Sequence, residues 1–198
     1  MQSFYCFIPA RLKSTRFPNK MLINIRGLPL ISYVYKKCLK SKFFKNVVVA
    51  TCDNEILKEI KKIKGKAIMT SHLHKGCISR IAEAVIKKKN IKIKDYICIV
   101  QGDEVLVEFK LLNSLCKFVR NNKKNCNVVN VVSKIKDNKE YKSKSVIKAL
   151  IGENYNIINM LRTSITQNVK SFDKNISKKV FRQTGIIVIR KDFLIKYY

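Results

Sequence analysis

The sequence predicts an α/β protein built on an open, mostly parallel β-sheet, with a β-rich second half. Three observations support this prediction. Short apolar segments alternate with amphipathic helical segments as far as residue 122. The segment Tyr96–Val100 is apolar throughout, as is typical of a strand at the centre of a parallel sheet. Beyond residue 122 the alternation stops, and short strand-like segments separated by turns follow.

The first half is predicted to consist of alternating strands and helices. Phe4–Ile8 is a short apolar run that ends at Pro9 and predicts a buried strand, followed by a long loop over residues 9–20. Asp53 stands where it can cap a helix that Gly65 ends. The other strands are expected at 46–51, 66–70 and 96–100, and the other helices at 29–40, 78–88 and 111–119.

The second half is predicted to extend the same sheet and to add a small subdomain. Its clearest turn is Gly152-Glu153-Asn154. Residues 193–198 look like the first turn of a helix, so we expect the chain to lack a C-terminal segment. The strands of this half are expected at 128–133, 146–151, 157–162 and 185–189.

The chain is strongly basic, with 42 Lys and Arg against 13 Asp and Glu and a net charge of +29. This balance suggests nucleic-acid binding. However, only eight of the basic residues are Arg, the residue whose planar fork reads guanine and grips phosphate. The lysines are spread along the chain rather than gathered in one arm. We therefore interpret most lysines as a solvated surface and expect no specific nucleic-acid partner.

The cysteines and histidines predict neither disulfides nor zinc. The seven cysteines include no C-x-x-C pair, and most lie in apolar runs, as is typical of reduced core thiols in a cytoplasmic protein. His72 and His74 are too few for a zinc site without cysteines at the usual spacing. The apolar runs are far shorter than a membrane span and the first residues do not resemble a signal peptide, so we expect no membrane partner.

A basic loop follows the first predicted strand. Residues 9–20 read PARLKSTRFPNK and contain four cations and two hydroxyl groups. Ligands of open α/β sheets bind at the carboxyl ends of the strands, and Arg and Lys bind phosphate. The loop is therefore a candidate triphosphate site, although it has neither the G-x-x-x-x-G-K pattern nor any glycine.

Two adjacent carboxylates, Asp103 and Glu104, follow the predicted central strand. They cannot be core residues, because an unpaired buried charge is expensive. A carboxylate at the end of a strand and near a polyphosphate is a natural ligand for Mg²⁺. We expect Asp103, rather than Glu104, to hold the ion. The alternative is a helix N-terminus, where the dipole favours acidic side chains.

These two motifs, with others in the same order, resemble those of the sugar-acid cytidylyltransferases. The most similar branch is that of the 3-deoxy-manno-octulosonate cytidylyltransferases. The most specific segments are residues 8–20 and Val100-Gln101-Gly102-Asp103-Glu104, and the resemblance covers essentially the whole chain. The weaker matches are Val48–Thr51 with Asp53, Met69–Ser71 with His74, Arg80–Glu83, Arg162, Gln183–Ile186, Arg190 and Phe193–Leu194.

The resemblance implies a nucleotide-diphospho-sugar transferase-like fold and a Mg²⁺-dependent reaction of CTP with a sugar acid. It implies one domain, with a nucleotide-binding half at 1–122 and a sugar-binding and dimerisation half at 123–198, and a homodimer. The anomeric hydroxyl would attack the α-phosphorus in line, a reaction that depends on positioning and charge neutralisation. The implied nucleotide-binding residues are Ala10, Arg11, Ser14, Arg16, Lys20 and Arg80; the catalytic residues are Arg11, Lys20 and Asp103, of which Asp103 holds Mg²⁺; the sugar-acid residues are Gln101, Arg162 and Gln183.

The chain departs from the family's pattern in several places. Within Gly76-Cys77-Ile78-Ser79-Arg80, only Arg80 keeps the usual residue type, and part of this segment lies beside the cytosine in relatives. Gln183 stands where this branch usually has His, and the family's tail with a second metal-binding Asp is expected to be missing. The implied function is CMP transfer to a Kdo-like sugar acid for lipopolysaccharide or surface polysaccharide synthesis. The alternatives are a degenerate relative that at most binds nucleotide, and a basic nucleic-acid-binding protein.

Overall fold

The computed structural model describes residues 2–13, 17–122, 126–163, 178–196 and 198. They form two compact units. The first unit consists of Met1–Val129 with Gly185–Tyr198, and the second is Asn130–Thr184. Each unit is described by itself.

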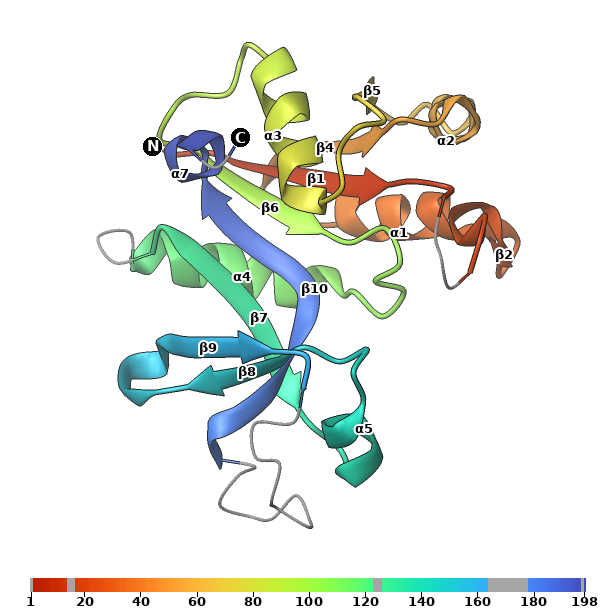
Figure 1. Cartoon of the computed structure of the whole chain (residues 1–198). Helices are drawn as coiled ribbons and strands as arrows, with labels where there is room; N and C mark the ends of the chain where they lie inside the picture. The colour runs from red at the N-terminus through yellow and green to blue at the C-terminus, as the bar shows by residue number, and fades with distance from the viewer. Residues whose placement is uncertain (1, 14–16, 123–125, 164–177, 197) are drawn as a thin grey trace. The chain divides into compact units, whose positions relative to one another are not determined.

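The first unit is built on the predicted open sheet (Figure 1). Three parallel strands and a short parallel edge strand lie side by side, and one antiparallel strand follows them. The mostly parallel sheet is therefore confirmed. The strand order is β5 (Ala67–Met69), β4 (Phe44–Thr51), β1 (Phe4–Ala10), β6 (Tyr96–Val100) and β10 (Val180–Arg190).

Helices cover both faces of this sheet. On one face, Ile81 and Val85 of α3 (Cys77–Lys87) and Leu194 of α7 (Lys191–Lys196) pack against odd-numbered residues of β1 and β6. Figure 1 shows α1 and α4 on the other face. Helix α1 spans Leu30–Leu39, α2 spans Asn54–Lys62 and α4 spans Phe109–Asn121.

Strand β1 extends two residues further than the sequence predicts, through Pro9 and Ala10. Proline lacks an N–H donor and is tolerated where one side of a strand is unpaired. The pairing of β1 with β6 ends at Phe7, whereas the pairing with β4 continues to Ala10. Pro9 therefore lies where β1 projects beyond β6. This extension places Arg11 at the carboxyl edge of the sheet.

The loop that follows β1 leads into elements that the sequence analysis did not predict. A single 3-10 turn, η1 (Lys20–Leu22), is followed by a hairpin of β2 (Asn24–Ile25) and β3 (Leu28–Pro29). Its two turn residues, Arg26 and Gly27, both have positive φ, which suits a two-residue hairpin turn. Arginine in that position is an uncommon turn signal, so the hairpin could not be read from the sequence.

The second unit is β-rich, as predicted, and has a small core of Ile135, Tyr141 and Val180 with Leu150 packed against it. Strand β10 begins at Val180 rather than at the predicted Gly185, and its first residues pair with β8. Strand β8 also pairs with β9, both times antiparallel, and β7 pairs with β10. The elements are β7 (Val128–Lys134), α5 (Asn138–Lys142), β8 (Lys148–Ile151), η2 (Glu153–Tyr155) and β9 (Ile157–Leu161).

All seven cysteines are free thiols, and five of them are buried. Burial, with Cys38 and Cys98 nearby, raises the pKa of Cys6 well above its ordinary value, so this thiol stays protonated. The prediction of reduced core thiols is thus confirmed for most of them. In the described part of the chain, no helix is both long enough and apolar enough to cross a membrane.

Candidate active site

The two loops that the sequence analysis singled out meet at the carboxyl edge of the first unit's sheet. Gly102 shows how closely they pack, because a Cβ atom added there would lie 3.0 Å from the Pro9 carbonyl oxygen and 3.0 Å from the Met21 sulfur. The backbone of the basic loop is closed by a hydrogen bond from the Asn19 N–H to the Leu12 carbonyl, 3.1 Å long. This closure returns Lys20 to the sheet edge.

Lys20 and Asp103, two of the three predicted catalytic residues, form an ion pair across these loops. The Lys20 Nζ and Asp103 Oδ2 atoms are 2.5 Å apart, although 83 positions separate the residues in sequence. The side chains are 26% and 44% exposed, so solvent and ligands can reach both. An accessible cation and an accessible carboxylate side by side are suited to binding a phosphate chain together with a metal ion.

Asp53 occupies the N-cap position of α2, but its carboxylate makes no capping hydrogen bond. The expectation that the Asp53 side chain caps this helix is therefore wrong. Instead, Oδ2 accepts a hydrogen bond of 2.8 Å from the backbone N–H of Leu12. Arg11, the preceding residue, is exposed, and Ala10 is buried at the end of β1. Asp53 thus tethers the basic loop beside Arg11. The sequence could not separate a cap from a tether, because a short side chain with an acceptor oxygen suits both roles.

Glu104, the second acidic residue, is engaged by the backbone. Its Oε2 atom accepts a hydrogen bond of 3.0 Å from the Gly185 N–H, and the Gln101 N–H donates to the Gly185 carbonyl at 2.8 Å. These two bonds fix the loop over residues 101–104 against β10. Glu104 is therefore occupied, whereas Asp103 faces Lys20.

Arg80 is a buried residue of helix α3 in the first unit, and its side chain reaches back to the loop between β5 and α3. Its Nη1 atom donates to the Thr70 hydroxyl at 2.6 Å and to the Ser71 carbonyl at 3.2 Å. These contacts hold the start of the loop. The role in nucleotide binding that was predicted for Arg80 stays a prediction. Ser14 and Arg16 lie outside the described residues.

Glu83 holds the same loop from the first turns of α3. It accepts hydrogen bonds from the Ser71 N–H at 2.8 Å and is paired with His74 at 2.5 Å and Lys87 at 2.6 Å. Burial opposes ionisation of Glu83, but the hydrogen bonds from Lys87, Ser71 and His74 outweigh it and lower its pKa to about 2. The segment 70–76, which precedes the altered residues 76–79, is thus firmly held.

The predicted sugar-acid residues Arg162 and Gln183 lie in the second unit. Arg162 directly follows β9 and is exposed, and its Nη1 atom donates to the Ser145 carbonyl at 3.4 Å. The side-chain amide of Gln183 donates to the Asn130 side chain at 3.1 Å. Gln101 belongs to the first unit. The roles predicted for these three residues in substrate binding stay predictions.

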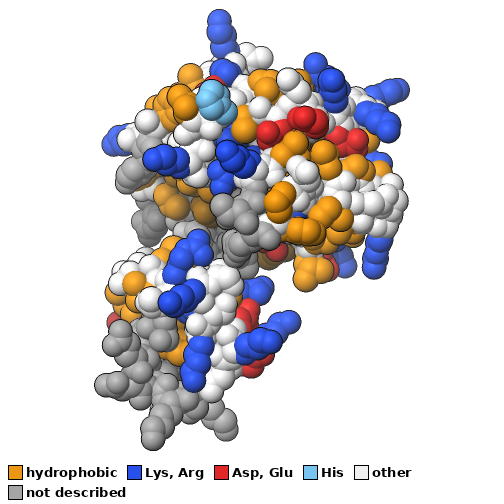
Figure 2. All heavy atoms as spheres, turned by 45° about the vertical axis from the view of Figure 1, so that its right-hand side comes forward, with side chains coloured by type: hydrophobic (Ala, Val, Ile, Leu, Met, Phe, Trp, Pro, Cys, Tyr) orange, Lys and Arg blue, Asp and Glu red, His pale blue; other side chains and the backbone are white. Residues whose placement is uncertain are grey.

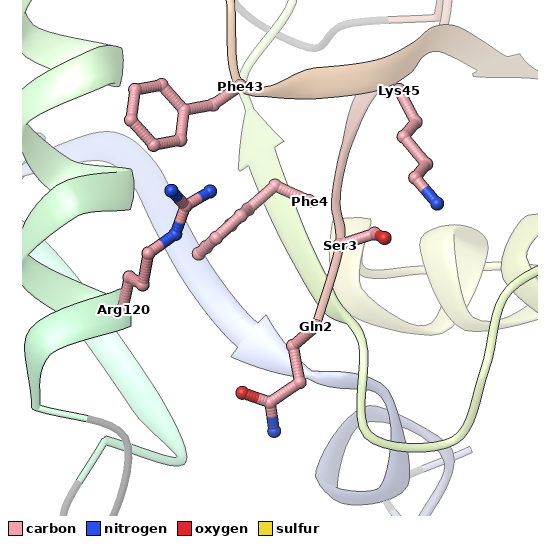
Figure 3. A pocket seen from close by; sticks show the side chains of 6 residues that line it. All are labelled: Gln2, Ser3, Phe4, Phe43, Lys45 and Arg120. Carbon is pink, nitrogen blue, oxygen red and sulfur yellow. The ribbon is translucent and has the colours of Figure 1, made fainter.

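A pocket lies at the opposite, amino edge of the first unit's sheet (Figure 3). The Arg120 guanidinium stacks over the Phe43 ring, 4.8 Å from its centre. Figure 3 shows Arg120 and Lys45 on opposite sides of Phe4, so the two cations do not converge on one point. Ligands of such sheets bind at the carboxyl edge. The pocket is lined by Gln2, Ser3, Phe4, Phe43, Lys45 and Arg120.

The fold and the ligand-facing edge together define a nucleotide-binding α/β transferase, in which a basic loop and a carboxylate loop meet at the ends of parallel strands. Comparison with known proteins makes the class specific. The family model described as cytidylyltransferase matches residues 5–198. The chain belongs to the cytidylyltransferase family.

Relatives with a more specific description are similar over nearly the whole chain. The chain is 36% identical to the 3-deoxy-manno-octulosonate cytidylyltransferase of Fusobacterium nucleatum, over 98% of this chain and 76% of that protein. It is 33% identical to the protein of the same description from Thermodesulfovibrio yellowstonii, over 89% of this chain and 70% of that protein.

A solved structure confirms the expected transferase fold. It is described as CMP:2-keto-3-deoxy-manno-octonic acid synthetase complexed with CTP. The two structures superpose with a TM-score of 0.84 at 27% sequence identity, over 99% of this chain and 77% of that chain.

Proposed function

We propose that this protein transfers the cytidylyl group of CTP to 3-deoxy-manno-octulosonate, giving the CMP-sugar and pyrophosphate for lipopolysaccharide synthesis. The observation that carries the proposal is the Lys20–Asp103 ion pair at the carboxyl edge of the sheet, where the basic loop and the carboxylate loop meet. The descriptions of the relatives and of the CTP-bound structure support the choice of both substrates. The free thiols suit a cytoplasmic reaction.

Lys20 and Arg11 are the residues that we assign to the triphosphate of CTP. The Lys20 ammonium is paired with the Asp103 carboxylate. A triphosphate offers it a stronger anionic partner, because charge-assisted hydrogen bonds to phosphate are short and strong. Arg11 stands on the tethered part of the loop, where its exposed guanidinium can reach the same phosphates. Ala10, Ser14, Arg16 and Arg80 complete the proposed nucleotide set.

Asp103 is the residue that we assign to a divalent cation, which we propose to be Mg²⁺. Mg²⁺ is commonly held by one or two carboxylates together with phosphate oxygens and water, so a single accessible carboxylate beside a phosphate site fits the ion. Within the described residues, no group of three or more His, Cys, Asp or Glu could hold a metal by itself. The bound ion would supply neutralisation of charge on the phosphates.

Arg162, Gln101 and Gln183 are the residues that we assign to the sugar acid. The Arg162 guanidinium suits the carboxylate of the sugar, and the two amides suit its hydroxyl groups. In the proposed reaction the anomeric hydroxyl oxygen forms a bond to the α-phosphorus, the bond to the bridging oxygen of the β-phosphate breaks, and pyrophosphate leaves. The hydroxyl proton is released to solvent. Such a transfer needs no covalent nucleophile from the protein.

The proposed function is tested by measuring the melting temperature with each nucleotide and the release of pyrophosphate. We expect CTP with Mg²⁺ to raise the melting temperature more than ATP, GTP or UTP at equal ionic strength, and the chain to release pyrophosphate when 3-deoxy-manno-octulosonate is added. Lys20→Ala and Asp103→Asn should each reduce kcat/KM roughly a hundredfold or more. The matched control is Lys94→Ala, which breaks an ion pair with Asp192 of 2.8 Å elsewhere in the first unit.

Each outcome has a defined meaning. Selective stabilisation by CTP without turnover would favour a degenerate relative that binds nucleotide only. Equal stabilisation by all four nucleotides would contradict the assignment of a cytidine site. The homodimer implied by the resemblance is tested by light scattering on the same samples.

A further inference from the structure

Lys148 has a fully buried side chain in the second unit, and the reaction described above gives it no role. It is the first residue of β8, and its exposed fraction is 0%. Lys148 and Leu150 lie on the same face of the strand, and Leu150 packs against the small core of this unit. Burial lowers the pKa of the Lys148 ammonium. A cation is expensive to bury, so its position calls for a reason.

The ammonium group of Lys148 joins two segments of backbone. It donates a hydrogen bond of 2.5 Å to the Ser143 carbonyl and one of 3.1 Å to the Arg162 carbonyl. Ser143 lies just beyond α5, and Arg162 lies just beyond β9. Neither partner neutralises the positive charge. What these bonds provide is a fixed position for the two carbonyl groups, because a hydrogen bond to a charged donor is stronger than a neutral one.

The segment at Ser143 also reaches the guanidinium of Arg162. The Ser145 carbonyl accepts a hydrogen bond of 3.4 Å from Arg162 Nη1. Within this segment, the Ser143 and Ser145 hydroxyl groups are 2.8 Å apart, and the Ser145 N–H donates to the Ser143 hydroxyl. Arg162 is thus held at its backbone by Lys148, and at its guanidinium by a turn that Lys148 also holds.

We propose that Lys148 is a positioning residue for Arg162, which keeps the guanidinium in place for the carboxylate of the sugar acid. The inference rests on the proposed function, because it takes the sugar acid as the ligand of Arg162. Lys148 itself is fully buried and acts through Arg162 rather than by contact with the substrate. Recognition of a carboxylate by Arg depends on the alignment of a planar fork, so a small displacement weakens it.

The test replaces the ammonium and measures binding of each substrate separately. In Lys148→Met, we expect the Kd of 3-deoxy-manno-octulosonate, titrated calorimetrically in the presence of CMP, to rise roughly ten- to a hundredfold. Its KM in the full reaction should rise in parallel. The KM for CTP and the rise in melting temperature caused by CTP should stay within about twofold of the wild-type values.

Two further variants separate positioning from stability alone. Lys191→Met is the matched control, because the Lys191 ammonium also donates to a backbone carbonyl, that of Ile91 at 2.6 Å, but in the first unit. It should leave the Kd of the sugar acid unchanged. Lys148→Gln keeps N–H donors without the charge and should recover part of the affinity for the sugar acid. If Lys148→Met does not fold, Lys148→Gln takes its place in the test.

The outcomes distinguish this inference from the proposed function. An unchanged Kd for the sugar acid in folded Lys148 variants would overturn the inference, and so would an equal loss of affinity for CTP and the sugar acid. In either case, turnover by the wild-type chain would leave the proposed function standing. A wild-type chain that binds the sugar acid without turnover would contradict the proposed reaction and still test Lys148. Absence of sugar-acid binding by the wild-type chain would overturn both.

Discussion

Asp53 holds the basic loop at one defined point, and this contact can be tested by itself. We expect Asp53→Ala to raise the KM for CTP about tenfold, because the Leu12 N–H loses its partner and the backbone beside Arg11 is released. Asp53→Asn keeps an acceptor oxygen and should restore most of the affinity. Steady-state kinetics with CTP varied at saturating sugar acid provide the measurement.

Asp137 is the matched control, because it does cap its helix: its side chain accepts a hydrogen bond of 2.7 Å from the Glu140 N–H at the start of α5. Asp137→Ala should lower the free energy of unfolding by about 1 kcal/mol and leave the KM for CTP unchanged. A KM for CTP that rises equally in Asp53→Ala and Asp137→Ala would contradict the tether.

The residues of the candidate site differ in how far the sequence could predict them. Asp103 could be predicted because a carboxylate just after a buried strand must face solvent or a ligand, whereas Lys20 was indicated by the basic loop and by the family resemblance. The tethering role of Asp53 was hidden, because a helix cap has the same local pattern. Lys148 has a visible signal in the sequence, because it is a lysine inside the otherwise apolar run Val146–Ile151. What it contacts depends on Ser143 and Arg162, which only the fold brings together.

Strand β10 meets the carboxylate loop at Gly185, where there is no room for a side chain. A Cβ atom there would lie 2.7 Å from the Glu104 carboxylate and 2.8 Å from the Gln101 side chain. We expect Gly185→Ala to reduce the free energy of unfolding by about 1 to 3 kcal/mol and to reduce kcat, because the loop that carries Asp103 must shift. Chemical denaturation and turnover are measured on the same preparation.

Gly76→Ala provides the comparison for that variant. A Cβ atom at Gly76 meets nothing within 4 Å, and the backbone there has an ordinary extended conformation. Gly76 is the N-cap of α3, where Ala is less favourable than Gly, so the loss of stability should stay below about 1 kcal/mol. Equal effects of the two substitutions would show that the close packing at Gly185 is unimportant.

The loop between β5 and α3 should weaken in acid, because it is held by the ionised form of Glu83. The pKa of Glu83 is lowered from 4.5 to about 2 in the folded chain. A lowered pKa contributes stability above the unfolded value, and this contribution is lost as the pH falls from about 4.5 towards 2. Glu83→Gln should lower the free energy of unfolding by about 2 to 3 kcal/mol at pH 6. It should also reduce the acid limb, by which we mean the fall in the free energy of unfolding as the pH decreases below about 4.5.

Urea denaturation between pH 6 and pH 3 measures this effect. Part of the acid limb remains in Glu83→Gln, because hydrogen bonds from Arg190 and Lys94 also lower the pKa of Asp192. Glu55→Gln removes an exposed carboxylate of α2 and should retain the whole acid limb, because Glu83 is intact. An acid limb of the same slope in Glu83→Gln and the wild-type chain would contradict the assignment.

At the scale of elements, periodicity predicted most helices and strands within two or three residues of their observed bounds. Helix α3 was expected at 78–88 and lies at Cys77–Lys87, and β6 lies where it was expected. The bounds of β1 and β10 were too short, because their ends are set by pairing with β4 and β8 rather than by local composition. The hairpin of β2 and β3 was missed, because its turn residues have no strong local signature.

At the scale of the whole molecule, the net charge of +29 attracts any polyanion, whatever its sequence. Three of the eight arginines are engaged by other residues of the chain: Arg80 with Thr70, Arg182 with Glu140 and Arg190 with Asp192. Figure 2 shows Lys and Arg side chains as separate groups over the face in view, with apolar and acidic side chains between them. Such a surface attracts nucleic acid without reading it.

We therefore expect two unrelated DNA duplexes to bind with equal affinity at low salt, and both affinities to fall by about a factor of a thousand or more between roughly 50 and 200 mM salt. Stabilisation by CTP relative to ATP should persist at 200 mM, because a site with fixed partners depends on geometry as well as on charge. Fluorescence anisotropy with labelled duplexes and thermal unfolding with each nucleotide measure the two effects. A preference for one duplex that survives at 200 mM, together with loss of the CTP preference, would instead favour a nucleic-acid-binding protein.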